Sequence, residues 1–135
     1  PICVIDLDTV MPGSALYDYG DAIRSGANTA GEDEEDLSLV HFDLGLFERF
    51  TAGYLSAAGD RLTPEEIRLF PQAAQILTLE LCARFLTDYL NGDVYFKVKK
   101  PGHNLIRTRN QIELVRQMET RMHEMASIVE KYSQQ

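Results

Sequence analysis

Residues 72–90 read QAAQILTLELCARFLTDYL, a run rich in Leu, Ala, Gln and other residues that favour helices. Proline and glycine are absent from this run, whereas Pro71 precedes it and Asn91-Gly92-Asp93 follows it. Proline is tolerated in the first turn of a helix, and an Asn-Gly-Asp sequence ends one. The sequence therefore predicts one long helix over residues 72–90, and its many apolar residues indicate that this helix is largely buried.

Two shorter helices are predicted upstream from their start signals. Residues 63–66 (TPEE) place a capping Thr, a first-turn Pro and a capping-box Glu in the favoured order. Asp43 can cap a second helix that begins at Leu44, and Gly59 can end it. Apolar residues recur at helical spacing through this second segment, at Phe47, Phe50, Tyr54 and Ala58.

A last long helix is expected from about Leu105 to Lys131, with Asn104 as its cap. Its apolar side chains are 3, 4, 3 and 4 residues apart, which is the pattern of a seam that packs on another helix. They are Val115, Met118, Met122, Met125 and Val129. His103 lies in the preceding Pro-Gly turn and is expected to be a surface or capping residue.

The N-terminal segment differs from the rest of the chain. Residues 2–7 (ICVIDL) are short, apolar and β-branched, as in a buried strand, and residues 11–14 break the chain into a turn. A short helix is expected within residues 15–28, and a strand or an extended linker at residues 94–98. The predicted fold class is mainly α: one domain over residues 1–135, with one N-terminal strand at about 2–7 followed by helices.

The composition narrows the class of protein. The chain has 135 residues, of which 44% are hydrophobic and 25% charged, enough to build a core. Its net charge of -8 argues against a nucleic-acid partner, and the densest basic stretch, residues 97–100, is short. The acidic run at residues 32–36 is expected to be a solvated loop. Without a run of about 20 apolar residues or a signal-peptide pattern, we expect no membrane partner and a cytoplasmic location.

The two cysteines, Cys3 and Cys82, both lie in apolar stretches, and neither belongs to a CxxC pair. Both are expected to be buried and reduced, as in a cytosolic protein.

Two carboxylates, Asp6 and Asp8, stand at the end of the predicted N-terminal strand. A carboxylate there is held rigidly by the sheet and points its oxygens outward, which suits Mg²⁺. Gly13 follows Asp6 by seven residues, and Asp18 follows Gly13 by five. This pattern resembles the signature of the aminoglycoside and choline kinase-like phosphotransferases.

The likeness is stronger to one branch, the N-acetylhexosamine 1-kinase-like sugar kinases, and it covers most of the chain. The segments that resemble this branch are residues 4–13 (VIDLDTVMPG), 17–24 (YDYGDAIR), 85–90 (FLTDYL), 92–96 (GDVYF) and 102–107 (GHNLIR). Some members of the branch are labelled mucin desulfatase. Neither cysteine of this chain lies in the Cys-x-Pro-x-Arg setting that a sulfatase needs, so we treat that label as a name only.

The resemblance implies the C-terminal portion of a protein-kinase-like C-lobe, in which Asp6 binds Mg²⁺ and Asp18 hydrogen-bonds the backbone of the catalytic loop. The implied reaction transfers a phosphoryl group from ATP to a sugar, at the anomeric hydroxyl of an N-acetylhexosamine. An aminoglycoside, choline or another small alcohol is the alternative acceptor. The nucleotide lobe and the catalytic loop with its base would lie upstream of Pro1, so this chain alone is expected to be inactive.

Two other classes of function stay open. Residues 6–10 (DLDTV) fit the Asp-x-Asp-x-Thr/Val pattern of a haloacid-dehalogenase-type phosphatase, with Asp6 as nucleophile and Asp8 as general acid. That fold needs further parallel strands, whereas the chain after Val10 is nearly all helix. The other class is a non-catalytic helical interaction domain, whose strand-end carboxylates only cap a turn.

Glu80, Arg84 and Asp88 lie four residues apart on one stripe of the long helix. Charges among apolar neighbours must be paired or must line a cavity. One hypothesis makes Arg84 and Asp88 substrate-binding residues: Arg84 hydrogen-bonds sugar oxygens, and Asp88 orients Arg84. The alternative is an internal ion ladder that fixes the packing of the helix.

Three smaller expectations concern the N-terminal part. Asp8 is expected to cap its loop, with a place in the outer shell of the metal site as the alternative. Asp21 and Arg24 are expected to form an ion pair. A strand at residues 2–7 would expose an unpaired apolar edge, so we expect self-association through this strand.

Overall fold

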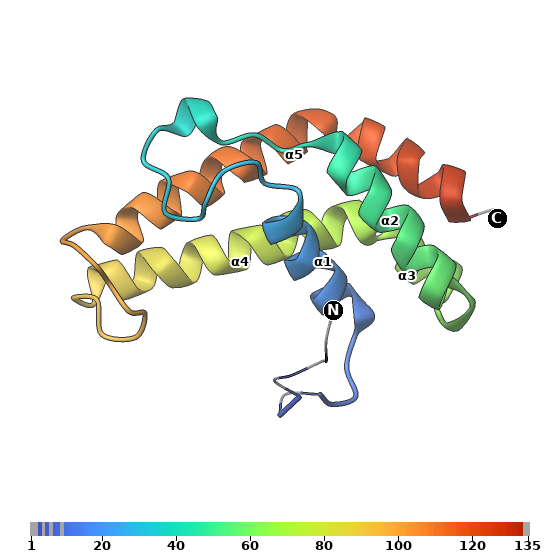
Figure 1. The fold of residues 1–135 in the computed structure, drawn as a ribbon, viewed down its shortest axis with the longest axis horizontal. Helices are drawn as coiled ribbons and strands as arrows, with labels where there is room; N and C mark the ends of the chain where they lie inside the picture. The colour runs from blue at the N-terminus through green and yellow to red at the C-terminus, as the bar shows by residue number, and fades with distance from the viewer. Residues whose placement is uncertain (1–2, 4, 6, 9, 134–135) are drawn as a thin grey trace.

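The computed structural model describes residues 3, 5, 7–8 and 10–133 (Figure 1). Over these residues the chain forms five α-helices and two short 3-10 helices. The prediction of a mainly α fold is therefore confirmed.

Two long antiparallel helices, α4 (Phe70–Leu90) and α5 (His103–Ser133), form the frame of the molecule (Figure 1). Both begin two residues before their predicted starts, and α5 also ends two residues later than predicted. The predicted seam of α5 is confirmed. Its members Val115, Met118, Met125 and Val129 are buried, and Met122 is half-buried.

Helix α1 (Ala15–Gly26) lies across α4 and places Tyr19 at the centre of the core. The Tyr19 ring stacks on Phe70 with 3.8 Å between ring centroids. Its hydroxyl lies 2.7 Å from the Thr51 hydroxyl, which in turn donates to the carbonyl of Phe47. Burial raises the pKa of Tyr19 well above its usual range. The phenol therefore stays neutral, and it donates a hydrogen bond to the Thr51 hydroxyl, whose own hydrogen is used toward Phe47.

The remaining helices follow the predicted start signals closely. Helix α2 (Leu44–Ala58) is capped by Asp43, which accepts from the N–H of Leu46 at 2.9 Å, and Gly59 ends it. After the 3-10 helix η2 (Gly59–Arg61), helix α3 (Pro64–Arg68) begins with the predicted capping box. The structure confirms these helix predictions. They could be made from sequence because each start signal depends on contacts within one turn of the chain.

The long connection between α1 and α2 contains the 3-10 helix η1 (Leu37–Leu39) and lies along α5. An isolated antiparallel bridge joins Asn28 to Phe42. The side chain of Gln117 on α5 accepts from the N–H of Phe42 at 2.9 Å and donates to the carbonyl of Val40 at 2.7 Å. One glutamine side chain thus ties this connection to α5.

The strand predicted at residues 2–7 is not formed at Cys3, Ile5 or Leu7, and the other residues of this segment lie outside the described residues. A strand needs a neighbour that pairs its N–H and C=O groups, and the described residues form no bridge except Asn28–Phe42. The expectation that Cys3 is buried is also wrong, because Cys3 is exposed. Cys82 is buried as predicted, and its thiol lies 3.7 Å from the carbonyl of Thr108.

Of the two alternatives predicted for residues 94–98, the structure shows a linker, with bends at Tyr95 and Phe96, and not a strand. The predicted cap at Asn104 is wrong: α5 starts one residue earlier, and Asn104 is buried in its first turn. Within the described part of the chain, none of the helices is long and apolar enough to cross a membrane.

The crossing of α1 and α4 depends on Gly20. A Cβ atom at Gly20 would lie 2.6 Å from the carbonyl oxygen of Ala73, which is backbone and cannot rotate away. We expect Gly20→Ala to lower the free energy of unfolding by about 1–3 kcal/mol, as overpacking does in cores. Gly53→Ala is the matched control, because its new methyl group meets nothing within 4 Å. We expect it to stabilise α2 by about 0.5–1 kcal/mol. Urea unfolding measures both, and equal effects would contradict the tight crossing.

Candidate functional site

The carboxylate of Asp88 near the end of α4 holds the start of the connection to α5. Asp88 is only 4% exposed. One oxygen accepts from the backbone N–H groups of Val94 and Tyr95, at 2.9 and 2.8 Å. The other accepts from the N–H of Phe96 at 2.9 Å and from the side-chain amide of Asn104 at 2.8 Å. We call this arrangement the Asp88 clasp.

Burial of Asp88 opposes ionisation, but the hydrogen bonds outweigh it. The N–H groups of Phe96, Tyr95 and Val94 and the amide of Asn104 all stabilise the charged form, so the pKa of Asp88 lies below its usual value. The negative charge of Asp88 is thus stabilised by oriented N–H dipoles, and among the described residues it forms no ion pair. Four donors also fill the approximately four acceptor positions of a carboxylate.

The chain reaches the clasp through a tight turn in the left-handed region of backbone conformation. Asn91 ends α4, and Gly92 and Asp93 then have φ values of 92° and 59°. Asp93 is not a glycine, so this conformation needs support from its surroundings. The support comes from Asn104, whose amide also donates to Asp93 at 2.8 Å. Asn104 thereby connects both carboxylates to the first turn of α5.

A cavity of about 540 Å³ lies between α4 and this connection. Glu80, Arg84 and Asp88 line it from α4, and Tyr95 and Phe96 line it from the opposite side. The Arg84 guanidinium lies over both rings, 5.8 Å from the centroid of Tyr95 and 5.4 Å from that of Phe96. It also lies 3.7 Å from the carboxylate of Glu80. The cavity therefore combines aromatic surface with one cation and one accessible anion.

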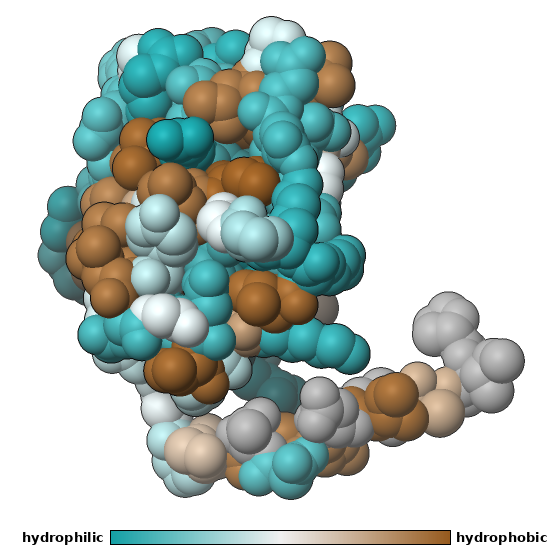
Figure 2. All heavy atoms as spheres, turned by 90° about the vertical axis from the view of Figure 1, so that its left-hand side faces the viewer, coloured by the Kyte–Doolittle hydropathy of each residue, from teal (hydrophilic) through white to brown (hydrophobic). Residues whose placement is uncertain are grey.

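Figure 2 shows the end of the molecule where α4 joins the connection to α5, with apolar side chains gathered between polar ones. Leu90, Val94 and Tyr95 are all more than 70% exposed in this part of the chain. Exposed apolar side chains beside a cavity are typical of a binding surface.

The structure brings the two predicted substrate-binding residues, Arg84 and Asp88, to the same cavity, but in different roles from those expected. Asp88 was expected to orient Arg84. Among the described residues, the ion pair of Arg84 is instead with Glu80. Glu80 and Arg84 are about half exposed, so they do not form a buried ion ladder with Asp88. Of the two alternatives, an internal ion ladder or a cavity lined by charges, the structure agrees with the cavity, which Glu80, Arg84 and Asp88 all line.

The residues predicted around a metal lie away from this cavity in the chain. Asp6 lies outside the described residues. Asp8 is exposed, and Asp18 is exposed in the first turn of α1. The described residues contain no group of three acidic, His or Cys side chains placed to hold a metal ion. The described residues thus provide no complete Mg²⁺ site.

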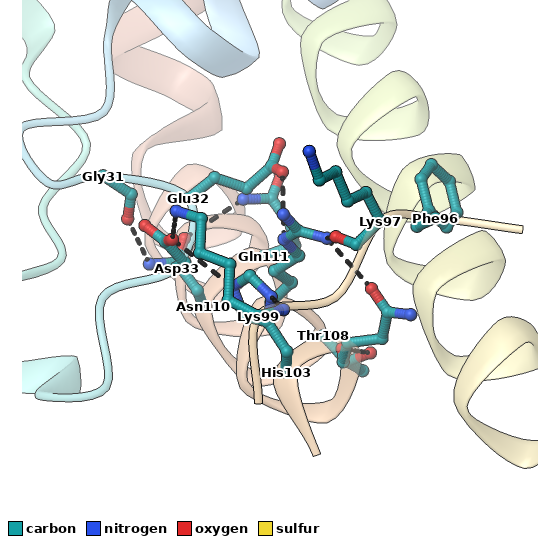
Figure 3. A network of polar contacts seen from close by, with 12 residues as sticks. Gly31, Glu32, Asp33, Phe96, Lys97, Lys99, His103, Thr108, Asn110 and Gln111 are labelled. Carbon is teal, nitrogen blue, oxygen red and sulfur yellow. Dashed lines mark hydrogen bonds and ion pairs between the residues drawn. The ribbon is translucent and has the colours of Figure 1, made fainter. Parts of the chain in front are cut away.

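The acidic run at residues 32–36 is the predicted exposed loop, and its carboxylates also form ion pairs that sequence analysis did not predict. Figure 3 shows Asp33, Lys99 and His103 pointing toward one another. Asp33 lies 3.0 Å from the Lys99 ammonium and 3.3 Å from Nε2 of His103. The hydrogen bond and positive charge of Lys99, followed by the hydrogen bond with His103, keep the pKa of Asp33 below its usual value. Lys100 pairs with Glu35 in the same way.

His103 was predicted to be a surface or capping residue, but it is buried at 1% exposure as the first residue of α5, so a place on the surface is wrong. Its Nδ1 accepts from the backbone N–H of Lys99 at 3.2 Å, which leaves the proton on Nε2 to face Asp33. Arg107 donates to the carbonyl of Lys97 at 3.3 Å and lies 3.6 Å from Glu32. The connection is therefore held at its start by the Asp88 clasp and at its end by this network.

Glu32 also accepts from Arg24 at 3.0 Å, and Arg24 forms the predicted ion pair with Asp21 at 2.9 Å. Sequence reasoning identified that pair because its members lie one helical turn apart.

No family model matches the sequence. The assignment of a function therefore depends on the resemblance of the motifs and on the geometry of the cavity.

The Asp88 clasp predicts a specific dependence of stability on pH. The pKa of Asp88 is lower in the folded protein than in the unfolded chain, where it is about 3.9. The ionised group thus stabilises the fold above that pH, and this contribution is lost as the pH falls through the folded-state pKa. We expect Asp88→Asn to lower the melting temperature at pH 7, because its NH₂ group faces the converging donors. The unfolding free energy of the variant should also depend less on pH below about 4.

Thermal unfolding followed by circular dichroism from pH 2 to pH 7 measures this effect. Asp60→Asn is the control, because it changes an exposed carboxylate on η2. Identical pH profiles for Asp88→Asn and the unmodified chain would show that the clasp contributes nothing.

Proposed function

We propose that this chain is part of an ATP- and Mg²⁺-dependent phosphotransferase of the aminoglycoside-phosphotransferase type, with a C-lobe related to that of protein kinases. The proposed acceptor is the anomeric hydroxyl of an N-acetylhexosamine such as GlcNAc or GalNAc. The proposed location is the cytoplasm. By the resemblance, Asp6 would hold Mg²⁺, which neutralises phosphate charge, and a base upstream of Pro1 would accept the proton.

The observation that best supports a sugar acceptor is the cavity beside α4. Its volume of about 540 Å³ lies within the range of small-molecule sites. A sugar ring presents C–H faces, which pack on aromatic rings, and hydroxyl groups, which need hydrogen-bond partners. Tyr95 and Phe96 supply the aromatic surface, and Arg84 and Glu80 supply a donor and an acceptor.

The hydrogen-bond inventory divides the roles of the two predicted residues. Arg84 is 46% exposed on its side chain, and its guanidinium has five N–H donors, so it can donate to an acetamide or hydroxyl oxygen. Asp88 has its acceptor positions filled by the clasp. We therefore assign Arg84 to sugar binding and Asp88 to positioning Tyr95 and Phe96.

The same cavity is less suitable for choline, one of the alternative acceptors. A quaternary ammonium such as choline binds over the faces of aromatic rings. Arg84 already lies over both rings, so it would exclude or repel such a cation. The phosphatase alternative receives no support, since the described residues contain no parallel sheet.

The test uses the longest natural polypeptide that contains this chain, assayed by coupled ADP release with GlcNAc and GalNAc. We expect Arg84→Ala to raise KM for the sugar about tenfold, corresponding to the loss of one charge-assisted hydrogen bond of ~1.4 kcal/mol. The melting temperature should stay nearly unchanged, because the side chain is half exposed.

Arg68→Ala is the matched control. Arg68 also forms an exposed ion pair within one helix, with Glu65, but it lies on α3. An unchanged KM with a lowered melting temperature in Arg84→Ala would assign Arg84 to structure only. No transfer to any N-acetylhexosamine would contradict the proposed acceptor.

A further inference from the structure

The turn that ends α4 contains Asn91-Gly92, the one place in the sequence where glycine follows asparagine. Asn91 is exposed, at the end of the molecule where α4 passes into the connection to α5 (Figure 1). Asparagine is among the thermolabile residues of proteins. It loses its side-chain amide when the backbone nitrogen of the next residue attacks the side-chain carbonyl carbon. Glycine hinders this attack least, because it has no side chain.

The other three asparagines are protected by their surroundings. Asn104 and Asn110 are fully buried on α5. Asn28 is held from two sides, because its amide donates to Asn110 at 3.3 Å and its oxygen accepts from the N–H of Ala30 at 3.1 Å. Each of the three is also followed by a residue whose side chain crowds the attacking nitrogen: Thr29, Leu105 and Gln111. Asn91 therefore differs from them both in exposure and in its neighbour.

Two hydrogen bonds of the last turn of α4 hold the backbone around Asn91. The N–H of Gly92 donates to the carbonyl of Tyr89 at 3.2 Å, and the N–H of Asp93 donates to that of Asp88 at 2.8 Å. With the φ of 92° at Gly92, they form a Schellman motif. The attacking nitrogen is thus held by one long hydrogen bond at an exposed helix end, where local opening costs little free energy. A Cβ atom at Gly92 would meet nothing within 4 Å, so the turn has room to move.

We propose that Asn91 is a site of spontaneous deamidation, and that this modification releases the Asp88 clasp. The nitrogen of Gly92 forms a bond to the side-chain carbonyl carbon of Asn91. The amide group of Asn91 leaves as ammonia, taking the proton of the Gly92 nitrogen. Water then opens the resulting cyclic imide at either of its carbonyl carbons. One opening gives aspartate, and the other gives isoaspartate, in which the main chain passes through the side-chain carbons.

Both products weaken the clasp. Each adds a negative charge at the carboxyl end of α4, which already carries the negative end of the helix dipole. The new charge lies three positions after Asp88 and two before Asp93. Isoaspartate also lengthens the main chain by one carbon atom, so the two Schellman bonds cannot both be kept. Asp93 then moves away from the Asn104 amide, which joins it to Asp88 at 2.8 Å on each side. The backbone of residues 94–96 thereby loses its fixed position.

Incubation of the folded chain at mildly alkaline pH, followed by tryptic digestion and mass spectrometry, tests the site. The four asparagines fall in four separate tryptic peptides, residues 25–49, 85–97, 100–107 and 110–116. We expect a gain of one mass unit in peptide 85–97, growing roughly tenfold faster than in the other three, because only Gly92 lacks a side chain. Asn91→Gln is the matched control and should remove the change, since glutamine would have to close a larger ring. Equal modification of all four peptides, or modification of peptide 85–97 only in the chain unfolded by urea, would overturn the site.

Anion exchange separates the product, which carries one more negative charge, so that its clasp can be examined. We expect its melting temperature to fall by a few degrees and the amides of residues 94–96 to lose their protection from hydrogen exchange. Asn91→Asp should reproduce part of this fall, because it adds the charge without lengthening the main chain. Full protection of these amides in the separated product would refute the release of the clasp. The sugar-kinase proposal is independent of these results, because phosphoryl transfer is assayed on freshly prepared protein.

Discussion

One ionised carboxylate, that of Asp88, fixes the path of the chain between the two long helices. Burying a charge is costly unless enough hydrogen bonds surround it. Here three backbone N–H groups and the Asn104 amide meet that requirement. Because three consecutive amides converge on one side chain, the backbone of residues 94–96 has little freedom. The positions of Tyr95 and Phe96, and with them the opposite wall of the cavity, follow from this constraint.

The clasp is effective because the helices on either side are themselves fixed. The close crossing at Gly20 and the stacking of Tyr19 on Phe70 hold α1 against the start of α4. The seam of α5 buries Met118 and Met125 against the same core. Asp88 near the end of α4 and Asn104 at the start of α5 are therefore brought together by core packing far from the cavity. In this way the apolar core determines the geometry of a polar site.

The sequence predicted those parts of the fold that depend on short-range contacts. The Asp43 cap, the Thr63 capping box and the α5 seam each involve residues within a few positions of one another. The strand at residues 2–7 could not be predicted reliably from local sequence, because a strand is stable only beside a pairing partner. Similarly, the prediction of a surface or capping role for His103 missed its burial, because its contact with Asp33 joins residues 70 positions apart in the sequence.

The candidate site was predictable in its residues but not in their contacts. The spacing of Glu80, Arg84 and Asp88 correctly placed three charges on one side of α4, next to a cavity. It could not show that Asp88 binds backbone amides, since an irregular connection leaves no periodic signal in the sequence. Tyr95 and Phe96 received no individual role for the same reason. The sequence did contain one signal for the cavity wall opposite α4: an aromatic pair, Tyr95 and Phe96, just after an Asn-Gly-Asp turn.

The central claim is that Asp88 holds the backbone of residues 94–96 and thereby shapes the cavity. Hydrogen exchange of the amides of Val94, Tyr95 and Phe96, measured by NMR at neutral pH, tests it most directly. If the clasp is formed, these three amides are protected from exchange as strongly as those in the last turn of α4, and the protection is lost in Asp88→Asn. Exchange at the rate of an unstructured peptide in the unmodified chain would contradict the account.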